Sequence, residues 1–192
     1  MRKLTALILL TCCGLSLSSC VSGVITGANA VYDRNSIEKT ASDYYLSMKI
    51  NQDIGSSPQI PQPNSIGITV FHRIVLLTGQ VPNAAAQQAA IDVAKNTPNV
   101  LRVFNAITIG SAISGASSAV DAWITAKIKT KMIATNGIDP GEIKVVTENG
   151  VVYLIGVVPQ DQATTATDLA SHTDGVKRVI TIFYYVVMPK IN

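Results

Sequence analysis

Two stretches of the 192-residue chain repeat one pattern: VLLTGQVP at residues 75–82 and VYLIGVVP at residues 152–159. Both read V-x-L-x-G-x-V-P, at an offset of 77 residues. Alternating apolar positions predict a strand, and a glycine inside a strand permits the close approach of a neighbouring backbone. Proline cannot donate to the ladder of a central strand, so it marks the end of the strand. The repeat predicts two copies of one structural unit.

Two more blocks repeat in the same order and support this interpretation. VLRV at 100–103 and VKRV at 176–179 share V-x-R-V at an offset of 76 residues. Upstream of the strands, five positions repeat at an offset of 78 residues: Asp43, Leu46, Lys49, Ile50 and Ile54 match Asp121, Ile124, Lys127, Ile128 and Met132. The two copies therefore span about 43–109 and 121–187.

Each copy predicts the order helix, strand, strand, helix, strand. Asp43 and Asp121 suit a helix N-cap, and the apolar residues after them recur at i, i+4 and i+8, as on a helix with one buried face. A second helix follows Pro82 or Pro159, with small residues on its buried face: Ala86, Ala90 and Val93 in the first copy, Ala163, Ala166 and Leu169 in the second. Two helices packed on one small sheet give an α+β fold.

The hairpin between the first two strands differs between the copies. Asn149-Gly150 is a strong signal for a two-residue turn in the second copy. His72-Arg73 stands at the matching positions of the first copy. Both residues of such a turn need a positive φ, which His and Arg tolerate poorly. We therefore expect a different loop in the first copy.

The αββαβ unit with its V-x-L-x-G-x-V strand resembles the BON domain. The resemblance is strongest in two stretches of the second copy: DAWITAKIKTKMIATNGIDPGEIKVVTENGVVYLIGVV at 121–158 and GVKRV at 175–179. The resemblance covers nearly the whole chain after the leader and is weaker in the first copy. It implies an α+β fold of two tandem BON domains, each αββαβ with two helices packed on a three-stranded sheet.

The composition of the remaining segments gives the expected domain boundaries. The segment before the first copy lacks clear periodicity and is interpreted as a tether, and GSAISGASS between the copies is typical of a flexible linker. We predict a lipoprotein signal peptide at 1–19, an acylated tether at 20–41, BON domain 1 at 42–110, a Gly/Ser linker at 111–119, BON domain 2 at 120–188 and a C-terminal tail at 189–192.

The N-terminus has the features of a bacterial lipoprotein signal. Two basic residues precede an apolar stretch at 4–17, which is too short to cross a bilayer comfortably. Leu17-Ser18-Ser19-Cys20 resembles a lipobox, in which the cysteine is acylated and becomes the first residue of the mature chain. Cys12 and Cys13 lie inside the leader, so Cys20 would have no disulfide partner. An ordinary signal peptide with a chance cysteine is the alternative.

Acylation of Cys20 would decide where the protein resides. Each buried CH₂ group contributes about 0.8 kcal/mol, so two or more acyl chains anchor a protein firmly. Val21, rather than aspartate, follows the cysteine. By resemblance to bacterial lipoprotein sorting signals, this implies a lipid anchor in the outer membrane, with the chain facing the periplasm.

Charge and motifs argue against nucleic-acid binding and catalysis. Loss of Arg2 and Lys3 with the leader leaves 13 basic residues against 12 acidic ones, without the dense basic face that nucleic acids require. His72 and His172 are the only histidines, and neither belongs to an H-x-x-x-H pattern. No P-loop or dinucleotide fingerprint is present. We predict no catalytic residue, no cofactor and no metal site.

The helix predicted from residue 121 to 135 carries the main functional clue. Trp123 lies about 140° around this helix from the buried stripe of Ile124, Ile128 and Met132. Ala122, Ala126 and Ile133 lie on the same outer side of the helix as Trp123. An apolar face rimmed by lysines suits an anionic bilayer, and tryptophan prefers the headgroup level. The predicted phospholipid-binding residues are Trp123, Ala126, Lys127, Lys129, Lys131 and Ile133.

The first copy keeps the buried stripe but changes this outer face. Tyr45 matches Trp123, Lys49 matches Lys127, Asn51 matches Lys129, Asp53 matches Lys131 and Gly55 matches Ile133. We therefore expect the first copy to lose two lysines and its largest outer apolar groups. The comparison predicts that the second copy binds membrane and that the first supports it.

A lipoprotein signal followed by two BON units resembles outer-membrane lipoproteins of this family. The resemblance implies binding of anionic phospholipid, such as phosphatidylglycerol, through the first helix of the second domain, and a role in outer-membrane integrity. The alternative is a periplasmic adaptor for outer-membrane protein assembly or for regulators of cell-wall amidases. In that case Trp123 would pack against domain 1, the linker or a partner protein.

Overall fold

The computed structural model describes residues 27–110 and 115–186, with the backbone alone for residues 27–37 and 115–116. The predicted signal peptide, Cys20 and the tail at 189–192 lie outside the described residues. The described residues from Ser36 onward belong to one compact unit. No helix in the described part of the chain has the length and apolar character needed to cross a membrane.

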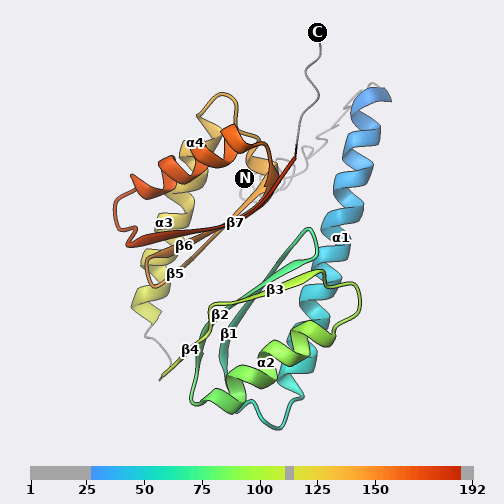
Figure 1. The fold of residues 1–192 in the computed structure, drawn as a ribbon, viewed down its shortest axis with the longest axis vertical. Helices are drawn as coiled ribbons and strands as arrows, with labels where there is room; N and C mark the ends of the chain where they lie inside the picture. The colour runs from blue at the N-terminus through green and yellow to red at the C-terminus, as the bar shows by residue number, and fades with distance from the viewer. Residues whose placement is uncertain (1–26, 111–114, 187–192) are drawn as a thin grey trace, which may run out of the picture. The chain divides into compact units, whose positions relative to one another are not determined.

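Both copies have the predicted αββαβ order, and the first adds a short strand, β4, at its end (Figure 1). The first contains α1 (Gly27–Gly55), β1 (Ser65–Phe71), β2 (Ile74–Val81), α2 (Ala84–Asn96), β3 (Arg102–Asn105) and β4 (Thr108–Ile109). The second contains α3 (Gly115–Ile133), a 3-10 turn at Pro140–Glu142, β5 (Ile143–Glu148), β6 (Val151–Val158), α4 (Gln160–Ser171) and β7 (Arg178–Tyr185). The α+β class is confirmed.

Each sheet has the V-x-L-x-G-x-V strand at its centre. β2 pairs antiparallel with β1 and parallel with β3, and β6 pairs in the same way with β5 and β7. The last strand of the first copy is interrupted at Ala106, whose N–H donates to Leu77, while the Asn105 side chain accepts from the N–H of Ile107. β4 then resumes the pairing with β2. The first sheet therefore has four strands where three were expected.

The two helices of each copy pack on one face of its sheet (Figure 1). In the second copy, buried residues of α3, β5, β6 and α4 form one core, and the first copy has the equivalent core. Alanine lines the second helix of each copy: Ala86, Ala90 and Ala94 in α2, and Ala163, Ala166 and Ala170 in α4. The predicted Val93 and Leu169 lie only partly buried at the edge of these cores. Small side chains let both helices lie close to their sheets.

The glycine that repeats in the central strand of each copy leaves room for a neighbouring backbone carbonyl group. A Cβ on Gly79 would lie 1.8 Å from the carbonyl oxygen of Ser65, and φ at Gly79 is +97°. A Cβ on Gly156 would lie 2.5 Å from the carbonyl oxygen of Glu142. The predicted close backbone approach at this position is confirmed in both copies.

The first helix of each copy starts earlier than the sequence predicts. α1 begins at Gly27, within the expected tether, and α3 begins at Gly115, within the expected linker. Neither extension contains proline, and continuing an existing helix costs little compared with nucleating one. The Ser117 hydroxyl also donates to the side-chain carbonyl oxygen of Asn149 at 3.1 Å.

Because of these extensions, the N-cap prediction for Asp43 and Asp121 is wrong. Both residues lie inside their helices, buried, and their carboxylates bind the hairpin turns instead. Asp43 accepts from the N–H groups of His72 at 2.7 Å and Arg73 at 2.8 Å. Asp121 accepts from Asn149 and Gly150 at the same two distances. The conserved pattern between copies therefore marks a helix-to-hairpin clamp.

The expectation of a different loop in the first copy is also wrong. Phe71 pairs with Ile74, so His72-Arg73 forms the same two-residue turn as Asn149-Gly150. His72 and Arg73 have φ angles of +51° and +64°. This left-handed conformation costs about 1–2 kcal/mol per residue. The charge-assisted hydrogen bonds from Asp43 offset that cost and hold the turn.

The sheet faces away from the helices are also partly buried. One cluster joins Ile74 and Leu76 of β2 with Tyr153 and Ile155 of β6 and with Ile182 of β7. Near it, His72 Nε2 lies 3.4 Å from a carboxylate oxygen of Glu142. Contacts between the copies thus come from strands and turns.

Candidate functional site

Helix α3 has one buried face and one exposed face, as predicted. Ile124, Ile128 and Met132 are buried in the core of the second copy. On the opposite side Trp123 is 53% exposed and Ile133 is 72% exposed. Ala126 is exposed between them along the helix. The apolar outer face that the sequence predicts is therefore accessible from solvent.

Lys127 lies between an aromatic ring and a carboxylate. Its Nζ is 4.6 Å from the centroid of the Trp123 ring, which is within the range of a cation–π contact. The same Nζ lies 2.5 Å from Oδ2 of Asp174, in the turn between α4 and β7. The hydrogen bond and charge of Lys127 lower the pKa of Asp174, so this carboxyl stays ionised at neutral pH.

Lys131 lies on the same edge of α3 and binds the end of helix α4. Its Nζ donates to the carbonyl oxygen of His172 at 3.1 Å and to Oγ1 of Thr173 at 2.9 Å. A cation near the last carbonyls of a helix stabilises that end. Lys131 therefore has a structural role in addition to the charge that it contributes to the outer face.

Lys129 lies on the other edge of α3, as predicted. Within residues 27–110 and 115–186, its ammonium group has no hydrogen-bond or ion-pair partner. It lines an open groove of about 540 Å³ together with Lys144 of β5 and Glu148 at the end of that strand. Burial raises the pKa of Glu148, and the nearby Asp121 raises it further. Lys129 is thus the lysine of this surface most available to a ligand.

Asp174 is the residue of this surface that sequence reasoning missed. The turn that carries it is fixed by Gly175, which has a φ of +85° and lies against Ile124 and Trp123. The first copy has Pro98 and Asn99 at the matching positions, and Asn99 also has a positive φ, of +69°. Extending the comparison of the copies to this turn would have revealed the added carboxylate.

The first copy differs in charge, as predicted, but not in apolar exposure. Lys49 forms an ion pair of 3.0 Å with Asp53 on its own helix. Tyr45 is 65% exposed, and Tyr44 and Met48 are exposed beside it. The expectation that the first copy loses its outer apolar groups is therefore wrong. It overlooked that Tyr44 and Met48 stand where the second copy has Ala122 and Ala126.

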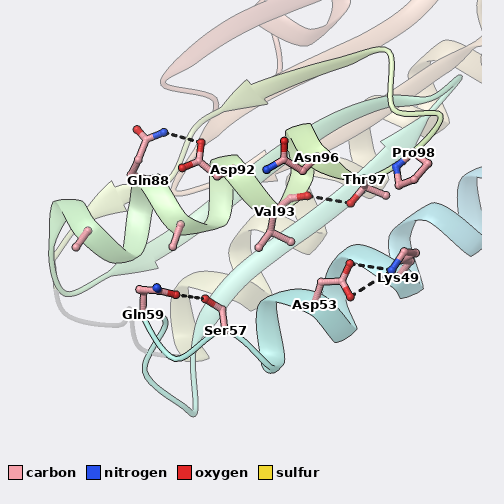
Figure 2. A pocket seen from close by; sticks show the side chains of 12 residues that line it. Lys49, Asp53, Ser57, Gln59, Gln88, Asp92, Val93, Asn96, Thr97 and Pro98 are labelled. Atoms are coloured by element: carbon pink, nitrogen blue, oxygen red, sulfur yellow. Dashed lines mark hydrogen bonds and ion pairs between the residues drawn. The ribbon is translucent and has the colours of Figure 1, made fainter.

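An open groove of about 820 Å³ runs between α1 and α2 of the first copy (Figure 2). Its polar groups bind one another: Lys49 binds Asp53, and Gln88 donates to Asp92 at 2.8 Å. Thr97 donates to the carbonyl oxygen of Val93 at 2.9 Å. These pairs leave no organised set of groups directed at a ligand.

The two histidines lie far apart in the sequence, one in a hairpin turn and one at the end of a helix. His72 lies in the first hairpin turn, and His172 is the C-cap of α4, where its Nδ1 is 3.1 Å from Asp168. Among the described residues, no group of three or more His, Cys, Asp or Glu side chains could hold a metal ion. The best-organised exposed feature is the surface of α3 with Trp123 and its lysines.

Comparisons with known proteins agree with the repeat. The sequence pattern of the BON domain family matches residues 42–111 and 120–182. The outer membrane lipoprotein DolP of Haemophilus influenzae is 35% identical over 173 residues, which cover 88% of this chain and 90% of that protein. A 21 kDa hemolysin of Actinobacillus pleuropneumoniae is 32% identical, covering 80% and 79%. The osmotically-inducible protein Y of Escherichia coli is 29% identical, covering 76% and 73%.

Proposed function

The chain belongs to the BON-domain family, and from this premise we propose that it is a non-enzymatic outer-membrane lipoprotein that binds anionic phospholipid through α3. The observation that carries the proposal is the exposed Trp123 ring with the Lys127 ammonium 4.6 Å from its centroid. An amphipathic ring beside cations suits the headgroup level of an anionic bilayer. Anionic phospholipid of the phosphatidylglycerol type is the proposed ligand.

The proposed location rests on the leader and on the relatives. Cys20 follows a lipobox-like sequence and would carry the acyl anchor. The similar protein of Haemophilus influenzae is named an outer membrane lipoprotein. We place this chain at the outer membrane, facing the periplasm, where it would support the integrity of the envelope.

Membrane contact through α3 would be weak without the anchor. Each lysine near an anionic surface contributes about 1 kcal/mol, and this contribution falls as the salt concentration rises. Lys127, Lys129 and Lys131 together would give modest, salt-dependent binding. A protein already tethered to the membrane needs no more, because tethering raises the effective concentration of the surface.

Co-sedimentation with liposomes tests the proposal directly. The chain from Val21 onward contains every described residue and lacks the acyl anchor. We expect it to sediment with vesicles that contain phosphatidylglycerol and to stay in solution with phosphatidylcholine alone. Lys129→Glu and Trp123→Glu should each reduce binding. Both positions are exposed, and Lys129 has no partner in the described part of the chain whose loss would disturb the fold.

Tyr45→Glu is the matched control for Trp123→Glu. It places the same charge at the corresponding, similarly exposed position of the first copy. We expect it to keep vesicle binding, with all variants checked for folding by circular dichroism. Equal binding by wild type and Trp123→Glu, or equal loss in Tyr45→Glu, would show that α3 is not the lipid site.

A protein adaptor is the second candidate function, and the exposed Tyr44, Tyr45 and Met48 of α1 favour it. Tyrosine and methionine are enriched in the centres of protein interfaces. The partners would be the outer-membrane assembly machinery or regulators of cell-wall hydrolases. A photo-crosslinking residue at Tyr44 that captures a protein in cells, while one at Trp123 captures none, would favour separate roles for the two helices.

A further inference from the structure

The position of Asp174 bears on how the α3 surface would engage a membrane. Its carboxylate is bound to Lys127 at 2.5 Å, although its own side chain is 85% exposed. The Trp123 ring lies on Lys127 as well. The ammonium group most closely associated with the tryptophan is therefore already neutralised within the protein.

The turn that presents Asp174 is held in place on both sides. Thr173 is buried, and its Oγ1 donates to the carbonyl oxygen of Leu169 at 2.8 Å and accepts from Lys131. Gly175 has a left-handed backbone, and a Cβ there would lie 3.0 Å from Cδ1 of Ile124. The turn that places the Asp174 carboxylate beside Lys127 is therefore held by hydrogen bonds and by packing.

We propose that Asp174 is an intramolecular competitor of the lipid phosphate: it occupies Lys127 in the free protein, and an anionic headgroup displaces it at the membrane. The inference rests on the proposed function and concerns the regulation of that same surface. A phosphate oxygen and a carboxylate oxygen seek the same ammonium donors. This competition restricts binding to surfaces dense in anionic lipid.

The first copy provides an internal comparison. Pro98 stands at the position that matches Asp174, and the matching lysine, Lys49, pairs with Asp53 on its own helix. The carboxylate from the α4–β7 turn thus occurs only in the copy that carries the tryptophan. This association supports a role at the lipid surface over a general requirement of the fold.

The test measures partitioning of the chain from Val21 onward onto phosphatidylglycerol vesicles for wild type and Asp174→Asn. We expect Asp174→Asn to bind about fivefold more tightly, since it frees the Lys127 ammonium and one lysine near an anionic surface contributes about 1 kcal/mol. Asp168→Asn is the matched control: it removes the same charge from a similarly exposed site near the end of α4. It should change binding by clearly less than Asp174→Asn.

A double-mutant cycle separates competition from simple repulsion. Lys127→Met removes the ammonium and keeps an unbranched apolar side chain beside Trp123. If Asp174 acts by occupying Lys127, then Asp174→Asn should have little effect in the Lys127→Met background. A full fivefold gain in that background, or no gain in the wild-type background, would overturn the proposal.

Two further measurements test which ligand is bound and distinguish a failure of the role of Asp174 from a failure of lipid binding by α3. Inorganic phosphate at matched ionic strength should not displace the protein from vesicles; displacement would mean that Lys127 selects free phosphate, which contradicts the proposal. Trp123→Glu is measured alongside. If Trp123→Glu abolishes binding while Asp174→Asn leaves it unchanged, only the role of Asp174 is wrong. If wild type does not bind vesicles at all, both proposals fail.

Discussion

The carboxylate of Asp43 accepts a hydrogen bond of 2.8 Å from the backbone N–H of Arg73, a residue 30 positions further along the chain. Asp121 makes the same contact with Gly150 in the second copy. In each copy one carboxylate therefore fastens the first helix to the tip of the first hairpin. In the second copy, hydrogen bonds from Ser117 to Asn149 and between Thr125 and Thr147 join the same two elements.

Removal of this clamp should destabilise the fold. Hydrogen bonds to charged groups contribute about 1.5–3 kcal/mol each, and Asp121 accepts two, so we expect Asp121→Ala to lower the free energy of unfolding by about 3 kcal/mol. Urea denaturation followed by circular dichroism measures this change. Asp92→Ala, on the exposed side of α2, should cost less than about 1 kcal/mol. Equal stability of the two variants would contradict the role of the clamp.

The first hairpin should gain stability from a turn sequence that suits its backbone. His72 and Arg73 have φ angles of +51° and +64°, a backbone conformation that Asn and Gly adopt at lower energetic cost. We expect the double variant His72→Asn/Arg73→Gly to be more stable by about 1 kcal/mol, after loss of the exposed Arg73 contact to Asn99. Thermal denaturation provides the measurement. A lower melting temperature would show that the His72 and Arg73 side chains contribute more than their backbone strain costs.

The strand glycine of the first copy should tolerate no side chain. A Cβ on Gly79 would meet the Ser65 carbonyl oxygen at 1.8 Å, so we expect Gly79→Ala to cost more than about 3 kcal/mol or to prevent folding of that copy. Gly137→Ala is the control, because Gly137 has a similar φ of +84° and nothing within 4 Å of the added carbon. It should cost only the backbone strain, about 1 kcal/mol. Similar losses in both variants would mean that the close approach to Ser65 is unimportant.

The sequence carried the architecture because the repeated positions are those that the fold constrains most. At these positions the packing admits few side chains, so the sequence pattern and the structure agree. They are the strand glycines Gly79 and Gly156, the alanines of α2 and α4, and the buried stripe of α3. The Asp clamp was misassigned because an aspartate that starts an apolar stripe is usually an N-cap. Its true partners, at 72 and 73, are distant in sequence and visible only in three dimensions.

The candidate site was predictable where it depends on helix periodicity and not where it depends on turns. The exposed faces of Trp123 and Ile133 follow from 3.6 residues per turn. Asp174 lies 47 residues from Lys127, in a turn whose position relative to α3 is visible only in three dimensions. The exposed Tyr44 and Met48 were visible in the sequence, but the comparison of the copies left out their positions.

Glu148 should make stability depend on pH in a predictable direction. Burial raises its pKa above the ordinary value of 4.5, and the charge of Asp121 acts in the same direction. Because the folded state holds the proton more tightly, ionised Glu148 lowers stability at neutral pH, and this penalty disappears below the unfolded-state pKa. Glu148→Gln should therefore be more stable than wild type at pH 7. The difference should shrink as the pH falls through the folded-state pKa toward 4.5, in urea denaturation at each pH.

Transfer of the α3 surface to α1 would test whether helix chemistry alone is sufficient for lipid binding. In a chain with Trp123→Glu, we expect Tyr45→Trp, Asn51→Lys and Asp53→Lys to restore part of the binding to anionic vesicles. Asp53→Lys removes the ion-pair partner of Lys49 and adds a cation. Together with Asn51→Lys, the variant gains two lysines and leaves Lys49 unpaired by Asp53. Each would contribute about 1 kcal/mol near an anionic surface.

Tyr45→Trp alone is the control for this transfer, because it supplies the ring without the charge. It should restore little, since the neighbouring Lys49 stays paired with Asp53. The first copy has Pro98 where the second has Asp174, so the transferred lysines meet no competing carboxylate from that turn. If the triple variant folds and still fails to bind, lipid recognition requires more of the second copy than its first helix, and the groove that holds Lys129 and Lys144 becomes the next part to transfer.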